Sequence, residues 1–97
     1  MPAQRNSQMP TPDQSPLQFP CAFPIKAMGL ATESFDALVV SIVRRHAPDV
    51  SESAVTVRSS AGGKYLAVTV TIQARSRAQL DAIYQDLVAR EEVLVAL

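Results

Sequence analysis

The sequence has no tryptophan and only one cysteine and one histidine. A single cysteine cannot form an internal disulfide, and a lone thiol fits a reducing compartment. One cysteine and one histidine also fall short of the three or four protein ligands that a zinc site needs. We therefore expect no disulfide framework, no metal centre and no cofactor.

The chain has no excess of charge of either sign, because nine basic residues balance nine acidic residues. A neutral chain has no overall field to attract nucleic acid or an anionic membrane. Its longest apolar runs, such as residues 37–40, are much shorter than a membrane-spanning helix. The first sixteen residues lack the apolar core of a signal peptide. These absences predict a cytoplasmic protein, exclude a membrane partner and disfavour nucleic acid.

The residues that are present divide the chain into two parts. Residues 1–16 contain Pro2, Pro10, Pro12 and Pro16 among glutamine, serine, asparagine and threonine. A segment with so little to bury cannot offset the entropy lost on ordering, so we predict a disordered tail. The remaining length allows one domain, which we place at residues 17–97.

Period-2 alternation predicts a first strand and a hairpin. In the first strand the inner face is Phe23, Ile25 and Ala27, and Gly29 is expected to end the run. Residues 55–58 and 65–73 are β-branched runs on either side of Gly62-Gly63, which is typical of a hairpin. Leu66, Val68, Val70 and Ile72 form the better core face of the second run. We therefore expect an interaction face on the opposite side of the sheet, formed by Lys26, Met28, Thr56, Tyr65, Thr69 and Thr71.

Helical spacing of apolar residues predicts two helices. The first has its apolar stripe between Phe35 and Val43, with Thr32 or Ser34 as N-cap and Pro48 as terminator. The second begins with the Ser76–Gln79 capping box, and its apolar stripe is Leu80, Ile83, Tyr84, Leu87 and Val88. Residues 91–97 are predicted to form a final strand.

The predicted order is strand, helix, strand, strand, helix, strand. This is the α+β, ferredoxin-like βαββαβ sandwich, a four-stranded antiparallel sheet with two helices on one face. The other face of the sheet is left open to solvent or to a partner.

Four segments together resemble the YbeD-like family of short bacterial proteins of unknown function: "FPCAFPIKAMG", "VVSIVRRHAPD", "GGKYLAVTVTIQA" and "LDAIYQDLVAREEVLVAL". The resemblance covers roughly residues 17–97. It implies a fold similar to the ACT-type ligand-binding regulatory domains. It implies no activity and no catalytic or binding residues, and a regulatory role would rest on analogy of fold alone.

The candidates for chemistry are few. Cys21 and His46 are expected near the same end of the domain, because the first helix runs antiparallel to the first strand. A catalytic cysteine needs a base and an orienting group, and no third group is identifiable, so a thiol enzyme is a disfavoured alternative. RNA binding is disfavoured too, because the third strand has Tyr65 only at its start and lacks the aromatic platform of an RRM. The "SSAGGK" segment joins two strands and lacks phosphate-loop spacing.

Two hypotheses remain for function, and neither is an enzyme. The first is a regulatory or interaction domain that senses a small metabolite in an ACT-like manner, with Gly29, Thr32 and Ser34 as candidate ligand-binding residues. The second is a protein-partner adaptor without a ligand. We also expect a possible homodimer through the sheet face or edge, because exposed edges otherwise need protection.

Overall fold

The computed structural model describes residues 17–97, and the tail predicted for residues 1–16 lies outside the described residues. The elements follow the predicted order, with a short 3-10 helix added before the hairpin. Their bounds are β1 Cys21–Leu30, α1 Phe35–Arg44, η2 Glu52–Ala54, β2 Val55–Ser59, β3 Tyr65–Ala74, α2 Arg77–Val88 and β4 Val95–Ala96.

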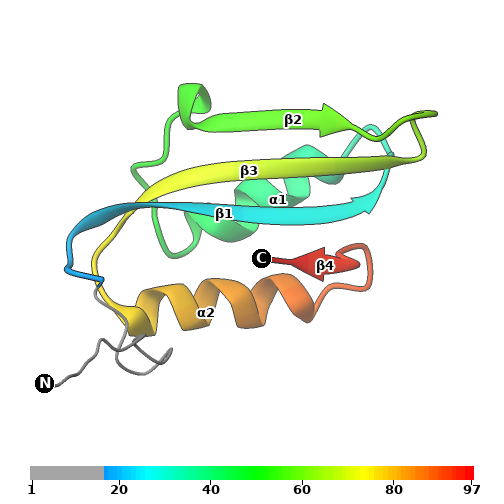
Figure 1. Cartoon of the computed structure of the whole chain (residues 1–97). Coiled ribbons are helices and arrows are strands. Elements are labelled where there is room, and N and C mark those ends of the chain that lie inside the picture. The colour runs from blue at the N-terminus through cyan, green and yellow to red at the C-terminus, as the bar shows by residue number, and fades with distance from the viewer. Residues whose placement is uncertain (1–16) are drawn as a thin grey trace, which may run out of the picture.

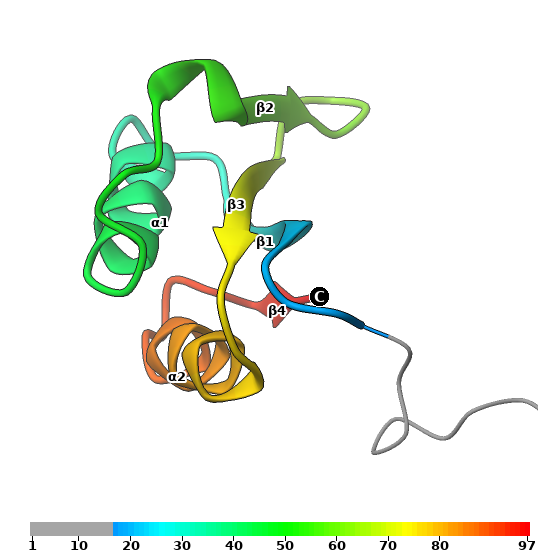
Figure 2. The ribbon, with the colours of Figure 1, turned by 90° about the vertical axis from the view of Figure 1, so that its left-hand side faces the viewer.

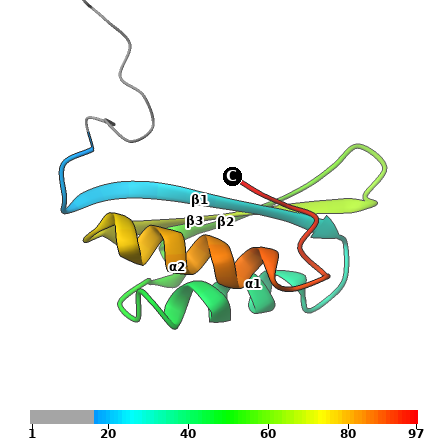
Figure 3. The same ribbon diagram turned by 90° about the horizontal axis from the view of Figure 1, so that it is seen from below.

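The strands form one antiparallel sheet in the order β2-β3-β1-β4. Figure 1 looks onto the open face of this sheet, with α1 passing behind the strands. Figures 2 and 3 show the sheet from its end and from below, and both helices lie on the same side of it. The predicted α+β sandwich is therefore confirmed.

The core lies between the sheet and the helices, as the alternation predicted. β1 contributes Ile25 and Ala27, and β3 contributes Val68, Val70, Ile72 and Ala74, all of them buried. Helix α1 buries Phe35, Val39, Ile42 and Val43, and α2 buries Leu80, Ile83 and Leu87. Burial of these side chains is the main force that holds the two layers together.

The helix starts follow the predicted capping only in part. Ser76 Oγ accepts a hydrogen bond from the backbone N–H of Gln79, and Gln79 Oε1 accepts one from the N–H of Arg75. The capping box is therefore present. The Gln79 side chain, however, binds the backbone N–H of Arg75, one residue before the N-cap Ser76. Ser34 is the N-cap of α1, but its side chain makes no capping hydrogen bond. Val88, predicted on the apolar stripe of α2, is 65% exposed.

Gly29 does not end β1, contrary to the prediction, because the strand continues through Leu30. Gly29 belongs to the buried face, next to Ile25 and Ala27. A Cβ atom at this position would lie 2.3 Å from the carbonyl oxygen of Glu92 and 2.4 Å from Cε1 of Phe35. The glycine is needed because a ring and a backbone oxygen approach the strand closely, and not because the chain turns there.

The sheet has two very different edges. β4 has only two residues, which pair with Ala27 and Met28 of β1. β2 at the other edge pairs with β3 from Val55 to Ser59.

The β2–β3 turn contains Gly62 and Gly63 at φ +85° and +73°, the left-handed conformation that glycine adopts without strain.

We predict that Gly29→Ala destabilises the fold by about 1–3 kcal/mol, because the added methyl group overpacks a site that has no room. Each kcal/mol lowers the melting temperature of a domain of this size by about 4–8 °C. Thermal and urea unfolding measure the effect. Leu30→Ala, next to it on the exposed side, is the control and should remain close to the wild type. Equal stability of Gly29→Ala and the wild type would contradict the packing argument.

Candidate interaction face of the sheet

The predicted interaction residues lie together on the open face. The register pairs Lys26 with Thr69 and Thr69 with Thr56, so these three form a row across β1, β3 and β2. Side chains of one row point to the same side of a sheet. Met28, Tyr65 and Thr71 occupy alternate positions of the same two central strands, on the same side. Whether these residues bind anything remains a prediction.

Apolar side chains gather at one end of the open face, where β1, β3 and β4 meet. Met28 pairs with Val95, and Leu30 pairs with Tyr65. Leu97 lies beside Lys26, because the two residues exchange backbone hydrogen bonds of 2.8 and 3.0 Å. Leu30, Val95 and Leu97 are 51%, 44% and 65% exposed. We call this group the apolar patch: Met28, Leu30, Tyr65, Val95 and Leu97.

Only two of the five residues of this patch were predicted from the sequence. Met28 and Tyr65 were predicted from alternation, but Leu30 was placed beyond the strand because Gly29 was expected to end it. Val95 and Leu97 were missed because the register of the last strand against β1 was not assigned. The apolar run of residues 93–97 could have indicated exposed apolar residues, because an edge strand cannot bury so many consecutive apolar side chains.

The charged side chains that the strands carry are all positive within residues 17–97. None of the aspartates or glutamates of residues 17–97 lies in a strand, whereas Lys26 and Arg58 do. Arg58 pairs with Ala67, which places it on the open face as well. Lys64 adds a third cation at the hairpin end, with its Nζ 5.5 Å from the centroid of the Tyr65 ring. The chain is neutral overall, but this face is basic and apolar.

The hairpin around "SSAGGK" is held by its own hydrogen bonds. The N–H of Gly63 donates to the carbonyl of Ser60, and the N–H of Tyr65 donates to Ser60 Oγ. The N–H of Ser60 donates to the carbonyl of Tyr65. Ser60 therefore closes the turn, and this arrangement agrees with the reading of the segment as a hairpin turn.

The residues predicted to bind a metabolite are not brought together. Thr32 and Ser34 line a shallow hollow of ≈ 350 Å³ beside the start of α1, with Arg90 and Glu92 on its far side. Gly29 lies under Phe35 in the core and does not line this hollow. Arg90 is paired with Glu92 at 3.1 Å, and this hydrogen-bonded partner lowers the pKa of the Glu92 carboxyl. The charged groups of the hollow thus bind each other.

A larger groove, of ≈ 800 Å³, lies between α1 and the β2 edge. Its walls are Asp36, Ala37, Val40, Ser41, Arg44 and Arg45 of the first helix region, with Glu52 and Val55 opposite. No residue of this groove was predicted as a site, because the outward side of a helix looks like an ordinary solvated surface in a sequence.

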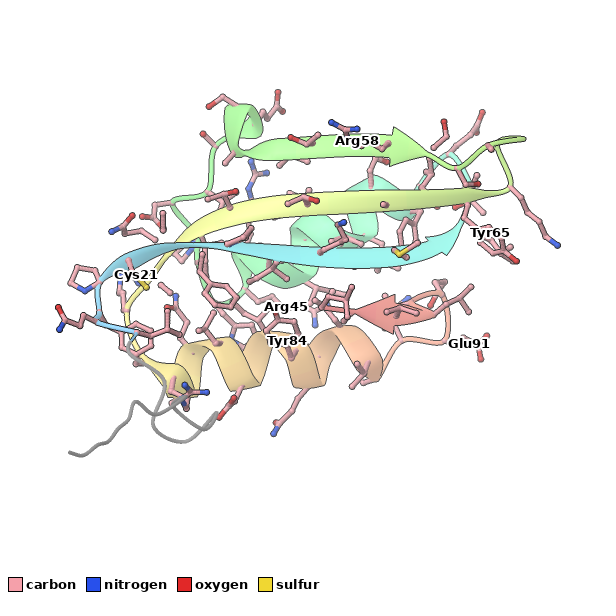
Figure 4. The ribbon with its side chains drawn as sticks, in the orientation of Figure 1. Cys21, Arg45, Arg58, Tyr65, Tyr84 and Glu91 are labelled. Atoms are coloured by element: carbon pink, nitrogen blue, oxygen red, sulfur yellow. The ribbon has the colours of Figure 1, made fainter. Side chains whose placement is uncertain are left out.

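The lone cysteine and the lone histidine have separate structural roles. Cys21 is the first residue of β1, on the inner face, and packs partly buried against the core. His46 Nε2 donates a 2.6 Å hydrogen bond to Asp86 of α2, and the backbone carbonyl of His46 accepts one of 2.7 Å from Gln79. His46 therefore ties the end of α1 to α2. Figure 4 shows Cys21 at one end of β1 and Tyr65 at the opposite, hairpin end.

Tyr84 of α2 joins the helix layer to the end of the sheet. Its hydroxyl donates a 2.7 Å hydrogen bond to the backbone carbonyl of Leu97, and its ring packs against the core. Partial burial raises the pKa of the Tyr84 hydroxyl. This bond holds the β4 end of the apolar patch in place (Figure 4).

We predict that His46 and Asp86 are energetically coupled by about 0.5–1 kcal/mol, because the hydrogen bond is short but both side chains are partly exposed. A double-mutant cycle with His46→Ala and Asp86→Ala, followed by urea unfolding, measures this coupling. Cys21→Ala combined with His46→Ala is the control cycle and should be additive. Coupling between Cys21 and His46, with none between His46 and Asp86, would contradict the conclusion that His46 ties α1 to α2.

Residues 17–97 contain neither a membrane-spanning helix nor a cluster of metal-ligating side chains. No helix in this range combines the length and the apolarity that crossing a membrane requires. No group of three or more histidine, cysteine, aspartate or glutamate side chains in this range is placed to hold a metal ion.

Comparison with known proteins identifies relatives along almost the whole chain. Residues 14–97 match a family model described as a protein of unknown function, DUF493. A UPF0250 protein of Nitrosomonas europaea is 49% identical over 75 residues, which cover 77% of this chain and 86% of that protein. A UPF0250 protein of Pseudomonas paraeruginosa is 47% identical over 90 residues, covering 90% of this chain and 97% of that protein.

The fold also matches a solved structure. The solution structure of protein HP0495 from H. pylori gives a TM-score of 0.65 at 12% identity, covering 95% of this chain and 98% of that chain. At this identity the match supports the fold alone, whereas the sequence relatives carry the family assignment and confirm the resemblance to YbeD-like proteins. The chain belongs to the DUF493, or UPF0250, family of small bacterial proteins of unknown function.

Proposed function

We propose that this domain is a non-enzymatic adaptor that binds a protein partner through the open face of its sheet. The partner surface presents apolar side chains next to carboxylates. The observation that carries this proposal is the apolar patch together with the basic side chains that the strands carry beside it. Lys26 lies between the patch and the threonine-rich part of the face, and Arg58 and Lys64 border it.

The chemistry of the partner follows from these two features. Leu30, Val95 and Leu97 remain about half exposed or more in the free domain. Full burial of a valine or leucine side chain contributes about 1.5–3 kcal/mol relative to exposure. A contact that covers three such side chains can therefore form a binding centre, and the cations around it favour an acidic partner and accelerate encounter.

Two observations favour a protein over RNA on this face. Tyr65 is the only aromatic residue among the strand positions that face outward in residues 17–97, and it lies at the end of β3. An RNA-binding sheet of this topology stacks bases on aromatic residues of its central strands. Here the central positions are Lys26, Met28, Ala67 and Thr69, which suit apolar and polar protein contacts.

Metabolite sensing at the α1 loop is the second hypothesis, and the geometry supports it less. The hollow beside Thr32 and Ser34 is small. The Arg90 side chain at this hollow forms a hydrogen bond with Glu92 and is therefore already paired. A ligand that binds the folded state alone raises the melting temperature, so a metabolite library screened by thermal shift tests this hypothesis independently.

We predict that Leu30→Glu and Lys26→Glu each reduce partner recovery at least tenfold, because the first puts a charge into the apolar contact and the second repels the acidic partner. Wild-type and variant domains are used as bait in lysate of the producing organism, and bound proteins are quantified by mass spectrometry. Val88→Glu, at an exposed apolar position on α2, is the matched control and should recover the same partner as the wild type.

The identity of the recovered protein gives a sharper test. A charge-reversing change of the partner's contact carboxylate to lysine should restore binding to the Lys26→Glu domain and weaken binding to the wild type. Recovery that is equal for the wild type, Leu30→Glu and Lys26→Glu would show that the open face is not the contact surface, and the proposal would fail.

A further inference from the structure

A thioether lies at the centre of the apolar patch. Met28 pairs with Ala67 of β3 on one side and with Val95 of β4 on the other. Leu30 is the next residue of β1 on the same face, and it pairs with Tyr65. The Met28 side chain is only partly buried. Solvent therefore reaches its sulfur in the free domain, whereas a partner bound to the patch would cover it.

No other sulfur atom of residues 17–97 is near this one. The second sulfur of this range belongs to Cys21, which lies on the inner face of β1 and packs partly buried against the core. Along a strand, positions 21 and 28 are separated by about 23 Å. Figure 4 shows Cys21 at the end of β1 that lies opposite to Tyr65. A reaction of a sulfur at the patch is therefore a reaction of Met28.

The chemistry open to a thioether is oxygen transfer from a peroxide, and it needs no prior deprotonation. The O–O bond of hydrogen peroxide breaks, one oxygen binds to the sulfur, and the other leaves as water. The sulfur loses two electrons, which the peroxide gains. The product is methionine sulfoxide, a polar and chiral side chain that methionine sulfoxide reductases convert back to methionine.

This product is incompatible with the contact proposed for the open face. The sulfoxide oxygen is a hydrogen-bond acceptor, and burying it against apolar side chains without a donor is costly. Lys26 lies on the same face of β1, two residues and about 7 Å away, so its Nζ can donate to that oxygen. The bond would occupy a cation that we assign to the partner's carboxylate. One added oxygen atom thus weakens the apolar and the charged part of the contact together.

We propose that Met28 is a redox-sensitive modification site that controls the open face. Peroxide oxidises the Met28 sulfur and releases the protein partner, and enzymatic reduction of the sulfoxide restores binding. This inference rests on the proposed adaptor function, because the oxidation matters only where the open face is the contact surface.

The experiment treats the full chain with hydrogen peroxide and then uses it as bait for the protein that the untreated wild type recovers from lysate. Trypsin cleaves after Lys26 and Arg44, so Met28 is the one sulfur-containing residue of peptide 27–44, and its oxidation is read as the added mass of one oxygen atom. We expect the oxidised chain to recover about tenfold less partner or still less. Sulfoxide reductases with dithiothreitol as reductant should restore recovery.

Two variants separate Met28 from the other oxidisable residues. Met28→Leu keeps the size and apolarity of the side chain without sulfur, so it should recover the partner like the wild type and continue to do so after peroxide. Met28→Gln carries a polar group at a similar length, so it should recover little partner even without peroxide. Circular dichroism checks that each protein is folded. If the oxidised wild type unfolds, the folded Met28→Gln variant decides the matter.

Three results would overturn the inference. The first is a folded, oxidised chain that recovers as much partner as the untreated one. The second is a Met28 sulfur that peroxide leaves unmodified in the folded protein. The third is a Met28→Leu chain that loses the partner on peroxide treatment as the wild type does.

Failure of the adaptor function has a different signature, which needs no peroxide. Leu30→Glu and Lys26→Glu would then recover the partner like the wild type, or the wild type would recover none, and both proposals would fall. Loss of the partner in these two variants, with full recovery by the oxidised chain, would remove the role of Met28 alone.

Discussion

The antiparallel ladder between β1 and β3 is the constraint on which the other features depend. It pairs every residue from Cys21 to Leu30 with one from Ala74 to Tyr65, without a bulge. This register aligns Ile25 with Val70 and Ala27 with Val68 on the buried side, and it aligns Lys26 with Thr69 and Leu30 with Tyr65 on the open side. A slip of one residue would turn both sets over, so burial of the first set fixes the composition of the second. The basic and apolar character of the open face is thus a consequence of where the core is.

The alternation in β3 was sufficient to predict which side of the strand is buried, because Val68, Val70 and Ile72 are β-branched and their neighbours are alanine, threonine or glutamine. Both helices were predictable for the same reason, from the spacing of Phe35, Val39 and Ile42 and from the capping box at Ser76. Gly29 was not predictable. A glycine in a sequence suggests a turn, and only the tertiary approach of Phe35 and the Glu92 carbonyl shows that it is packed. The error placed Leu30, one of the five residues of the apolar patch, outside the sheet.

The groove between α1 and β2 was missed for a different physical reason. A helix that covers a sheet has one apolar stripe, and its remaining residues are assigned to solvent unless a neighbouring element is known. Val40 and Ala37 lie outside the apolar stripe of α1. They form one wall of a groove only because β2 lies beside α1 at the edge of the sheet. The opposite signs of Asp36 and Arg45 were visible in the sequence, where they read as ordinary complements of the helix dipole.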